Sequence, residues 1–127
     1  TLLSLLRPGV MSDDVLKAAA KKMATVLQKT TFSKPIYKAA AQRMLEFKGH
    51  LSHPVGLAVH DCGSYRERPL EPGVVLSVDP MTWVPEEELY IRCEDTVVVT
   101  KNGIENFTAA APLDLDDVEA WMRKGNK

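Results

Sequence analysis

The 127-residue sequence lacks several features that would assign it to a common class of protein. Its 16 basic and 17 acidic residues give a net charge of −1, so there is no basic excess of the kind that binds nucleic acid. No apolar run approaches the roughly 20 residues that a membrane helix needs. A glycine-rich phosphate loop and a Gly-x-Ser-x-Gly nucleophile turn are also absent. We therefore expect neither a nucleic-acid partner nor a membrane partner.

Cysteine is scarce, and the two cysteines, Cys62 and Cys93, lie 31 positions apart. The absence of a Cys-x-x-Cys pair excludes a zinc ribbon and a thioredoxin-like motif. A disulfide remains possible on count alone, but two reduced, buried thiols in a cytoplasmic protein are the expectation. Cys62 follows His60 and Asp61, yet a thiol nucleophile is disfavoured, because neighbours along a strand point in opposite directions.

The hydrophobic pattern predicts one α+β domain. Hydrophobic residues make up 45% of the chain and charged residues 26%, which are ordinary values for a folded domain. Helical spacing comes first and strand-like runs come second, without βαβ alternation. The expected helices span residues 12–28, 35–49 and 114–123, and the expected strands span residues 55–59, 74–78, 90–100 and 104–108. Asn102-Gly103 predicts a hairpin between the last two strands.

The start of the chain resembles the end of a helix. The leucine-rich run at residues 2–6 carries an apolar face, and Pro8 terminates it. The sequence also lacks an initiator Met, so we expect it to be a piece of a longer protein. Ser12 is the expected N-cap of the next helix.

Two carboxylates interrupt the apolar strands. Asp79 ends the run at residues 74–78, and Glu94 stands just ahead of three valines. A buried carboxylate costs several kcal/mol unless it is paired or bound to a metal. Two simpler interpretations remain open, because Glu94 could pair with Arg92 on the same strand face and Asp79 could be a turn residue before Pro80.

The three histidines, His50, His53 and His60, fall within eleven residues. Histidine and carboxylate ligands together suit Zn, Mn, Co or Fe, so the group favours a metal site. His60 could instead be a structural histidine. His53 and His60 are also seven positions apart, and a regular strand would direct them to opposite faces unless Pro54 and Gly56 break the alternation.

Three blocks of the sequence resemble the motifs of the Xaa-Pro aminopeptidases and prolidases. The blocks are residues 49–61 (GHLSHPVGLAVHD), 68–80 (RPLEPGVVLSVDP) and 91–100 (IRCEDTVVVT). Their order and spacing match the family over nearly the whole chain, and the methionine aminopeptidase branch is less similar. The resemblance implies the pita-bread fold, in which helices pack on a mostly antiparallel, curved sheet.

The resemblance also implies an activity, namely metal-dependent hydrolysis of the bond before a proline at the second position of a peptide. The family binds two divalent ions, commonly Mn, Co or Zn. Two alternatives stay open: a non-catalytic pita-bread module that binds peptides or proteins, and an amidinohydrolase similar to creatinase.

The family motifs give each site residue an implied role. The ligands of the metal ions are His53, Asp79 and Glu94, and Glu94 bridges both ions. Asp79 doubles as the general base. His60 contacts substrate and moves protons, and Arg92 lies beside the bridging carboxylate.

The chain departs from the family in ways that set further expectations. The family's two Asp ligands lie upstream of the helix that ends here at Pro8, so residues 1–127 would form a partial domain with three of five ligands. Alone, such a chain should be inactive and should need its missing N-terminal half or self-association. Position 79 carries Asp where Glu is usual, and the motif's first His falls on Gly49, so His50 is the neighbouring substrate-binding candidate.

Overall fold

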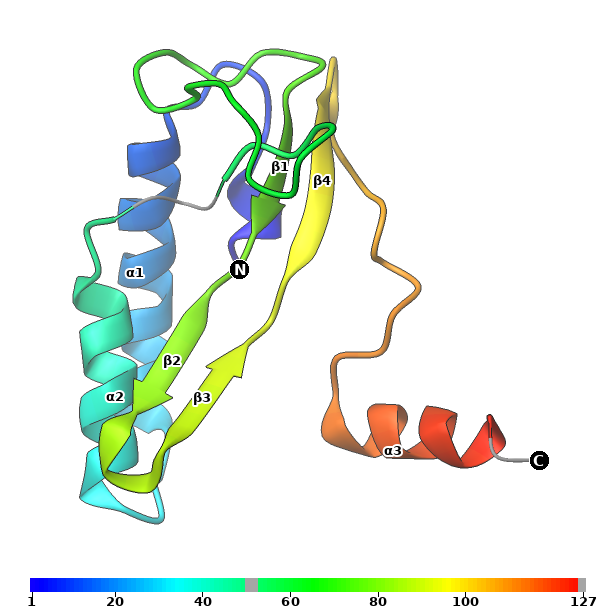
Figure 1. The fold of residues 1–127 in the computed structure, drawn as a ribbon. Coiled ribbons are helices and arrows are strands. Elements are labelled where there is room, and N and C mark those ends of the chain that lie inside the picture. The colour runs from blue at the N-terminus through cyan, green and yellow to red at the C-terminus, as the bar shows by residue number, and fades with distance from the viewer. Residues whose placement is uncertain (50–52, 126–127) are drawn as a thin grey trace.

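The computed structural model describes residues 1–49 and 53–125 and combines helices with antiparallel strands, which confirms the α+β class (Figure 1). The helical elements are η1 (Leu3–Leu5), α1 (Ser12–Lys29), α2 (Pro35–Glu46), η2 (Pro85–Glu87) and α3 (Leu115–Lys124). The strands are β1 (Val75–Val78), β2 (Met81–Val84), β3 (Leu89–Arg92), β4 (Asp95–Thr100) and β5 (Gly103–Asn106). Within the described ranges, no helix has both the length and the apolar character of a membrane span.

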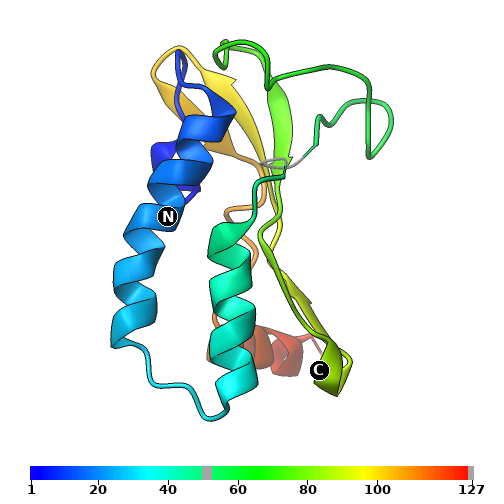
Figure 2. The ribbon, with the colours of Figure 1, turned by 90° about the vertical axis from the view of Figure 1, so that its left-hand side faces the viewer.

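The two long helices lie side by side and α2 packs on strand β2 (Figures 1 and 2). Helix α2 begins at Pro35, whose fixed φ and missing N–H suit a first helical turn. Side chains also hold α2 to the β2–β3 hairpin. Glu87, in the turn of the hairpin, pairs with Lys34 and accepts a hydrogen bond from the Tyr37 hydroxyl at 2.6 Å. Arg43 donates to the Trp83 carbonyl at 3.2 Å.

The hydrophobic core lies on the three-stranded antiparallel sheet, in which β4 is central between β1 and β5. The buried side chains of the core are Leu6, Val15, Tyr65, Leu70, Leu76, Val78, Val97 and Val99. They come from the first segment, from α1, from the segment that precedes β1 and from the two neighbouring strands β1 and β4. The strands with the most buried residues are therefore β1, which ends just before Asp79, and β4, which begins just after Glu94.

One register joins the two sheets. Val78 pairs with Asp95 at the end of β1, and Met81 pairs with Arg92 at the start of β2. Both pairs belong to the same register, so β1 and β2 form with β4 and β3 one long ribbon that is interrupted at residues 79–80 and 93–94. Within the interruption the Cys93 N–H still donates to the Pro80 carbonyl at 3.2 Å. Asp79 is thereby placed opposite Glu94.

Two strand predictions are wrong for identifiable reasons. The expected strand at residues 90–100 is two strands, because the ribbon is interrupted at Cys93 and Glu94 and the first part pairs with β2, which was not predicted. The expected strand at residues 55–59 is a bent loop, and the isolated bridge to Leu76 is formed by Pro54, just before it. The hairpin at Asn102-Gly103 is confirmed, since Thr100 pairs with Gly103.

The expectations at the helix ends are partly wrong as well. The leucine-rich start is a single 3-10 turn, η1, whose leucines pack against the core. Helix α2 ends at Glu46 and not at Gly49. Met11, and not Ser12, is the N-cap of α1, and Ser12 is fully buried with no hydrogen-bond partner for its hydroxyl among the described residues.

We expect Ser12→Ala to leave the free energy of unfolding unchanged or to raise it by up to about 1 kcal/mol, because it removes a buried hydroxyl without a partner. If Ser12 capped the helix, the same substitution would lower the free energy of unfolding by about 0.5–2 kcal/mol. Urea unfolding followed by circular dichroism measures the difference. A loss of stability in that range would show that Ser12 does cap α1.

Candidate active site

Two carboxylates face each other across the interruption of the ribbon. Like charges directly opposite on paired strands are destabilising, so Asp79 and Glu94 require a positive charge between them. Arg92 supplies it. Its Nη1 lies 3.2 Å from Asp79 Oδ2 and 3.9 Å from Glu94 Oε2. The pairing of Glu94 with Arg92, left open by the sequence, is therefore present.

Arg92 is held in this position by its neighbour on β3. Its Nε donates to the Tyr90 hydroxyl at 2.8 Å, and the guanidinium lies over the Tyr90 ring. The Tyr90 hydrogen bond, followed by the charges of Asp79 and Glu94, raises the pKa of Arg92 further above its ordinary value. Arg92 consequently stays charged and engages one oxygen of each carboxylate, which leaves the other oxygen of each for a different partner.

The second oxygen of Glu94 meets a serine and a histidine. Ser77 Oγ donates to Glu94 Oε1 at 2.6 Å, and His53 Nε2 lies 3.6 Å from the same oxygen. His53 Nδ1 is 3.1 Å from the Pro54 carbonyl, which can only accept a hydrogen bond. This contact favours the proton on Nδ1 and leaves a lone pair on Nε2, on the side of Glu94.

A folded loop brings the second histidine to the first. The His53 and His60 rings are 4.3 Å apart between centroids and nearly perpendicular, at 82°. The Asp61 carboxylate accepts hydrogen bonds from the N–H groups of Ala58, at 3.2 Å, and of Cys62, at 2.7 Å. These bonds fold the loop back on itself, so two histidines seven positions apart share one side of it.

The same hydrogen bonds explain the electrostatics of the loop. The Ala58 N–H, and after it the Cys62 N–H, lower the pKa of Asp61, because they stabilise its ionised form. The stabilisation that this carboxylate gives to the loop is therefore complete above the ordinary Asp range and is lost as the pH falls through the lowered pKa.

The structure brings most of the predicted residues together. His53, Glu94, Arg92 and Asp79 form a chain of contacts, with His60 against His53. His50 lies outside the described residues. In residues 1–49 and 53–125, no three His, Cys, Asp or Glu side chains form a group that could hold an ion.

The donor set nevertheless fits a divalent ion in part. His53 Nε2 and Glu94 Oε1 are an imidazole and a carboxylate directed at each other, as two ligands of one ion would be. Asp79 is joined to this pair through Arg92 and not directly. The chain thus holds a pair of adjacent ligand atoms and one neighbouring carboxylate, fewer than a complete site needs.

One contributor was missed from the sequence, and two expectations near the site were wrong. Ser77 was not singled out, although a polar residue inside the apolar run at 74–78 is a signal that could have identified it. Cys62 and Cys93 are free, but both are exposed and not buried as expected, because one lies in the loop and the other in the interruption of the ribbon.

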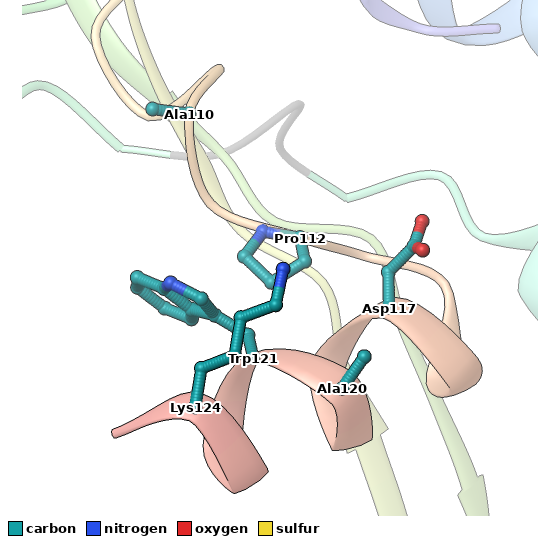
Figure 3. Close-up of a pocket in the computed structure, with 6 residues that line it drawn as sticks. All are labelled: Ala110, Pro112, Asp117, Ala120, Trp121 and Lys124. Carbon is teal, nitrogen blue, oxygen red and sulfur yellow. The ribbon is translucent and has the colours of Figure 1, made fainter. Parts of the chain in front are cut away.

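A pocket lies elsewhere, between α3 and the segment before it (Figure 3). The residues that line it are Ala110, Pro112, Asp117, Ala120, Trp121 and Lys124. None of them is a predicted site residue. The interruption of the ribbon therefore remains the place where the chemically active side chains gather.

Residues 1–101 match metallopeptidase family M24. The chain belongs to this family. Xaa-Pro aminopeptidase 2 of Streptomyces coelicolor is 36% identical to it over an alignment that covers 93% of the chain and 29% of that protein. The Xaa-Pro aminopeptidase of Escherichia coli K12 is 37% identical over an alignment that covers all of the chain and 32% of that protein.

Solved structures agree with the sequence relatives. Zinc-substituted E. coli aminopeptidase P in complex with product superposes with a TM-score of 0.73 at 34% identity, covering 99% of this M24 chain and 32% of the other. This confirms the predicted pita-bread fold and the resemblance to the Xaa-Pro aminopeptidases. The chain spans about a third of the length of these relatives.

We expect Asp61→Ala to open the loop, because the Ala58 and Cys62 N–H groups lose their acceptor. In the unaltered protein both amides should be protected from hydrogen exchange near pH 7, and the protection should fall once the pH drops below about 4. Hydrogen exchange followed by NMR measures both effects.

Asp116→Ala, at an exposed position of α3, is the matched control and should leave both amides protected. Protection that survived in Asp61→Ala would show that the carboxylate does not hold the loop.

Proposed function

We propose that this chain is the C-terminal, metal-binding part of an M24 enzyme that hydrolyses the bond between a first residue and a following proline in a peptide. The observation that carries the proposal is the contact chain His53–Glu94–Arg92–Asp79 at the interruption of the ribbon. The relatives that cover nearly all of the chain bear the name Xaa-Pro aminopeptidase, which supports this substrate class. A proline-specific dipeptidase activity is the closest variant of the same proposal.

In this proposal His53, Glu94 and Asp79 supply ligands to two divalent ions. Arg92 contacts one oxygen of each carboxylate. The other oxygen of Glu94, Oε1, faces His53 Nε2 and, beside the hydrogen bond that it accepts from Ser77, keeps a lone pair for an ion. Mn, Co and Zn all accept imidazole and carboxylate ligands. When bound, such ions bring the pKa of a water towards neutrality and polarise a scissile carbonyl.

The remaining chemistry falls to the side chains of this chain. Asp79 takes the proton of the attacking water as general base. His60, exposed and stacked edge-on against His53, contacts the peptide and passes a proton towards the leaving amine. Arg92 keeps the two carboxylates from repelling each other, and His50 lies close enough in sequence to His53 to be a further substrate contact.

The other ligands would come from the part of the parent protein that this chain does not include. We propose that the exposed apolar side chains of the β2–β3 hairpin pack on that part, or on a second copy of the chain. Met81, Trp83, Tyr90 and Ile91 are between 41% and 61% exposed. Met81, Trp83 and Tyr90 share one face of the hairpin, since Trp83 pairs with Tyr90. The exposed free thiols of Cys62 and Cys93 are compatible with the expected cytoplasmic location.

A non-catalytic peptide-binding module is the second candidate. The observation that favours it is that no three ligands are grouped in the described part of the chain. The two candidates differ in one respect that can be measured. If the chain belongs to an enzyme, metal binding and peptide hydrolysis depend on the same residues.

We expect Glu94→Gln to abolish both metal binding and Xaa-Pro cleavage in the intact parent protein, with kcat/KM lowered by about 10²-fold or more, because the substitution removes the charge that the ions share. Metal content by atomic emission and cleavage of an Xaa-Pro peptide with added Mn²⁺ are the measurements. Glu105→Gln on β5 removes an exposed carboxylate away from the site and should change neither.

His60→Ala provides the contrast, since it should lower kcat by about 10²–10⁴-fold while the metal content stays unchanged. If the Glu94→Gln protein kept its metal and its activity, the proposal that this chain belongs to a metal-dependent enzyme would be contradicted. A parent protein with no cleavage of any Xaa-Pro peptide, but with tight peptide binding, would favour the binding module.

A further inference from the structure

Two polar side chains are fully buried in the described chain, and they differ in their partners. Ser12 has none, whereas Ser77 Oγ donates to Glu94 Oε1 at 2.6 Å. A buried hydroxyl costs free energy unless it is hydrogen-bonded, and this distance is typical of a hydroxyl bonded to a carboxylate. Ser77 therefore has a partner that accounts for its place in an otherwise apolar strand.

The backbone of the same residue contacts the other ligand candidate. The Ser77 N–H donates to the His53 carbonyl at 3.0 Å. This bond belongs to a short contact between β1 and the segment that enters the loop, in which the Val55 N–H also donates to the Val75 carbonyl at 3.3 Å. One residue thus holds the main chain of His53 with its backbone and the side chain of Glu94 with its hydroxyl.

The register explains why Ser77 reaches Glu94. Ser77 pairs with Thr96 on β4, and Glu94 precedes Thr96 by two positions. Residues two apart share a face, so Ser77 and Glu94 are diagonal neighbours on that face. The core packing of β1 and β4 fixes this placement, since Leu76 and Val97, which form the adjoining pair, are fully buried.

We propose that Ser77 is a positioning residue that fixes the Glu94 carboxylate against His53 Nε2 before an ion binds. The inference rests on the proposed function, which supplies the ion. Without the hydroxyl, the Glu94 side chain, which is 39% exposed, is left between the lone pair of His53 Nε2 at 3.6 Å and the positive charge of Arg92 at 3.9 Å. The carboxylate would then turn towards Arg92 and away from His53, and the ligand pair would be lost.

The test compares Ser77→Thr with Ser77→Val in the intact protein. Thr and Val have the same shape, so their difference isolates the hydroxyl. We expect Ser77→Val to bind Co²⁺ about 10–100-fold more weakly, with an altered Co²⁺ absorption spectrum, and Ser77→Thr to stay close to the unaltered protein. If neither the Thr nor the Val variant folds, Ser77→Ala, which adds no volume, is compared with the unaltered protein instead, and its Co²⁺ affinity should fall in the same way.

Ser12→Ala is the matched control, because it removes a hydroxyl of equal burial that does not touch Glu94, and it should leave Co²⁺ affinity unchanged. Equal Co²⁺ affinity in Ser77→Val and the unaltered protein would overturn the proposal. Equal weakening in Ser77→Thr and Ser77→Val would overturn it too, since the cause would then be packing.

A metal-free measurement separates this proposal from the proposed function. In a double-mutant cycle, the shifts in thermal midpoint of Ser77→Ala and Glu94→Ala should not add, because each removes the same hydrogen bond. Additive shifts would contradict the contact. If Ser77 and Glu94 were coupled in a protein that bound no Co²⁺, the proposed metal binding would be contradicted. The contact between Ser77 and Glu94 would still stand, and Ser77 would position the Glu94 carboxylate without a role in metal binding.

Discussion

Two carboxylates placed opposite each other on paired strands are the constraint on which the site depends. Asp79 and Glu94 occupy one position of a continuous register, and their charges repel unless a cation separates them. Arg92 reaches both carboxylates and meets part of that requirement. It engages only one oxygen of each. The other oxygen of Glu94 accepts a hydrogen bond from Ser77 and keeps a lone pair for a metal ion, which would complete the compensation.

The surrounding strands and helix offset the free-energy cost of this arrangement. β1 and β4 are the most buried strands and are tied together by their ladder of backbone hydrogen bonds, so the ribbon can be interrupted at Asp79 and Glu94 without losing its register. Beyond the interruption, Lys34 and Tyr37 hold the turn of the β2–β3 hairpin to α2 through Glu87. Both sides of the site are thereby anchored, one by the core and the other by a helix.

Much of the fold was predictable from local pattern. The two long helices, the buried strand before Asp79 and the final hairpin follow from hydrophobic spacing and turn residues. β2 was missed because four residues after a proline give no clear alternation, and its identity depends on pairing with β3. The loop at 55–59 has strand-forming residues, but the Asp61 carboxylate competes for its backbone N–H groups, which no strand propensity records.

The site was predictable to a different degree. Arg92 and Glu94 are two apart, so their contact follows from strand geometry. The approach of His53 to Glu94 joins residues 41 positions apart through a loop. The grouping of histidines and carboxylates favoured a metal site, and the resemblance to a known family named this pair as ligands. Ser77 was overlooked because a serine in a strand is unremarkable until its partner is known.

Zinc anomalous diffraction from crystals of the intact parent protein tests the central claim most directly. The account predicts a zinc ion within about 2.0–2.2 Å of both His53 Nε2 and a Glu94 carboxylate oxygen, with Arg92 still on the outer oxygens of Asp79 and Glu94. Zinc bound only elsewhere, with His53 and Glu94 left without an ion between them, would contradict it.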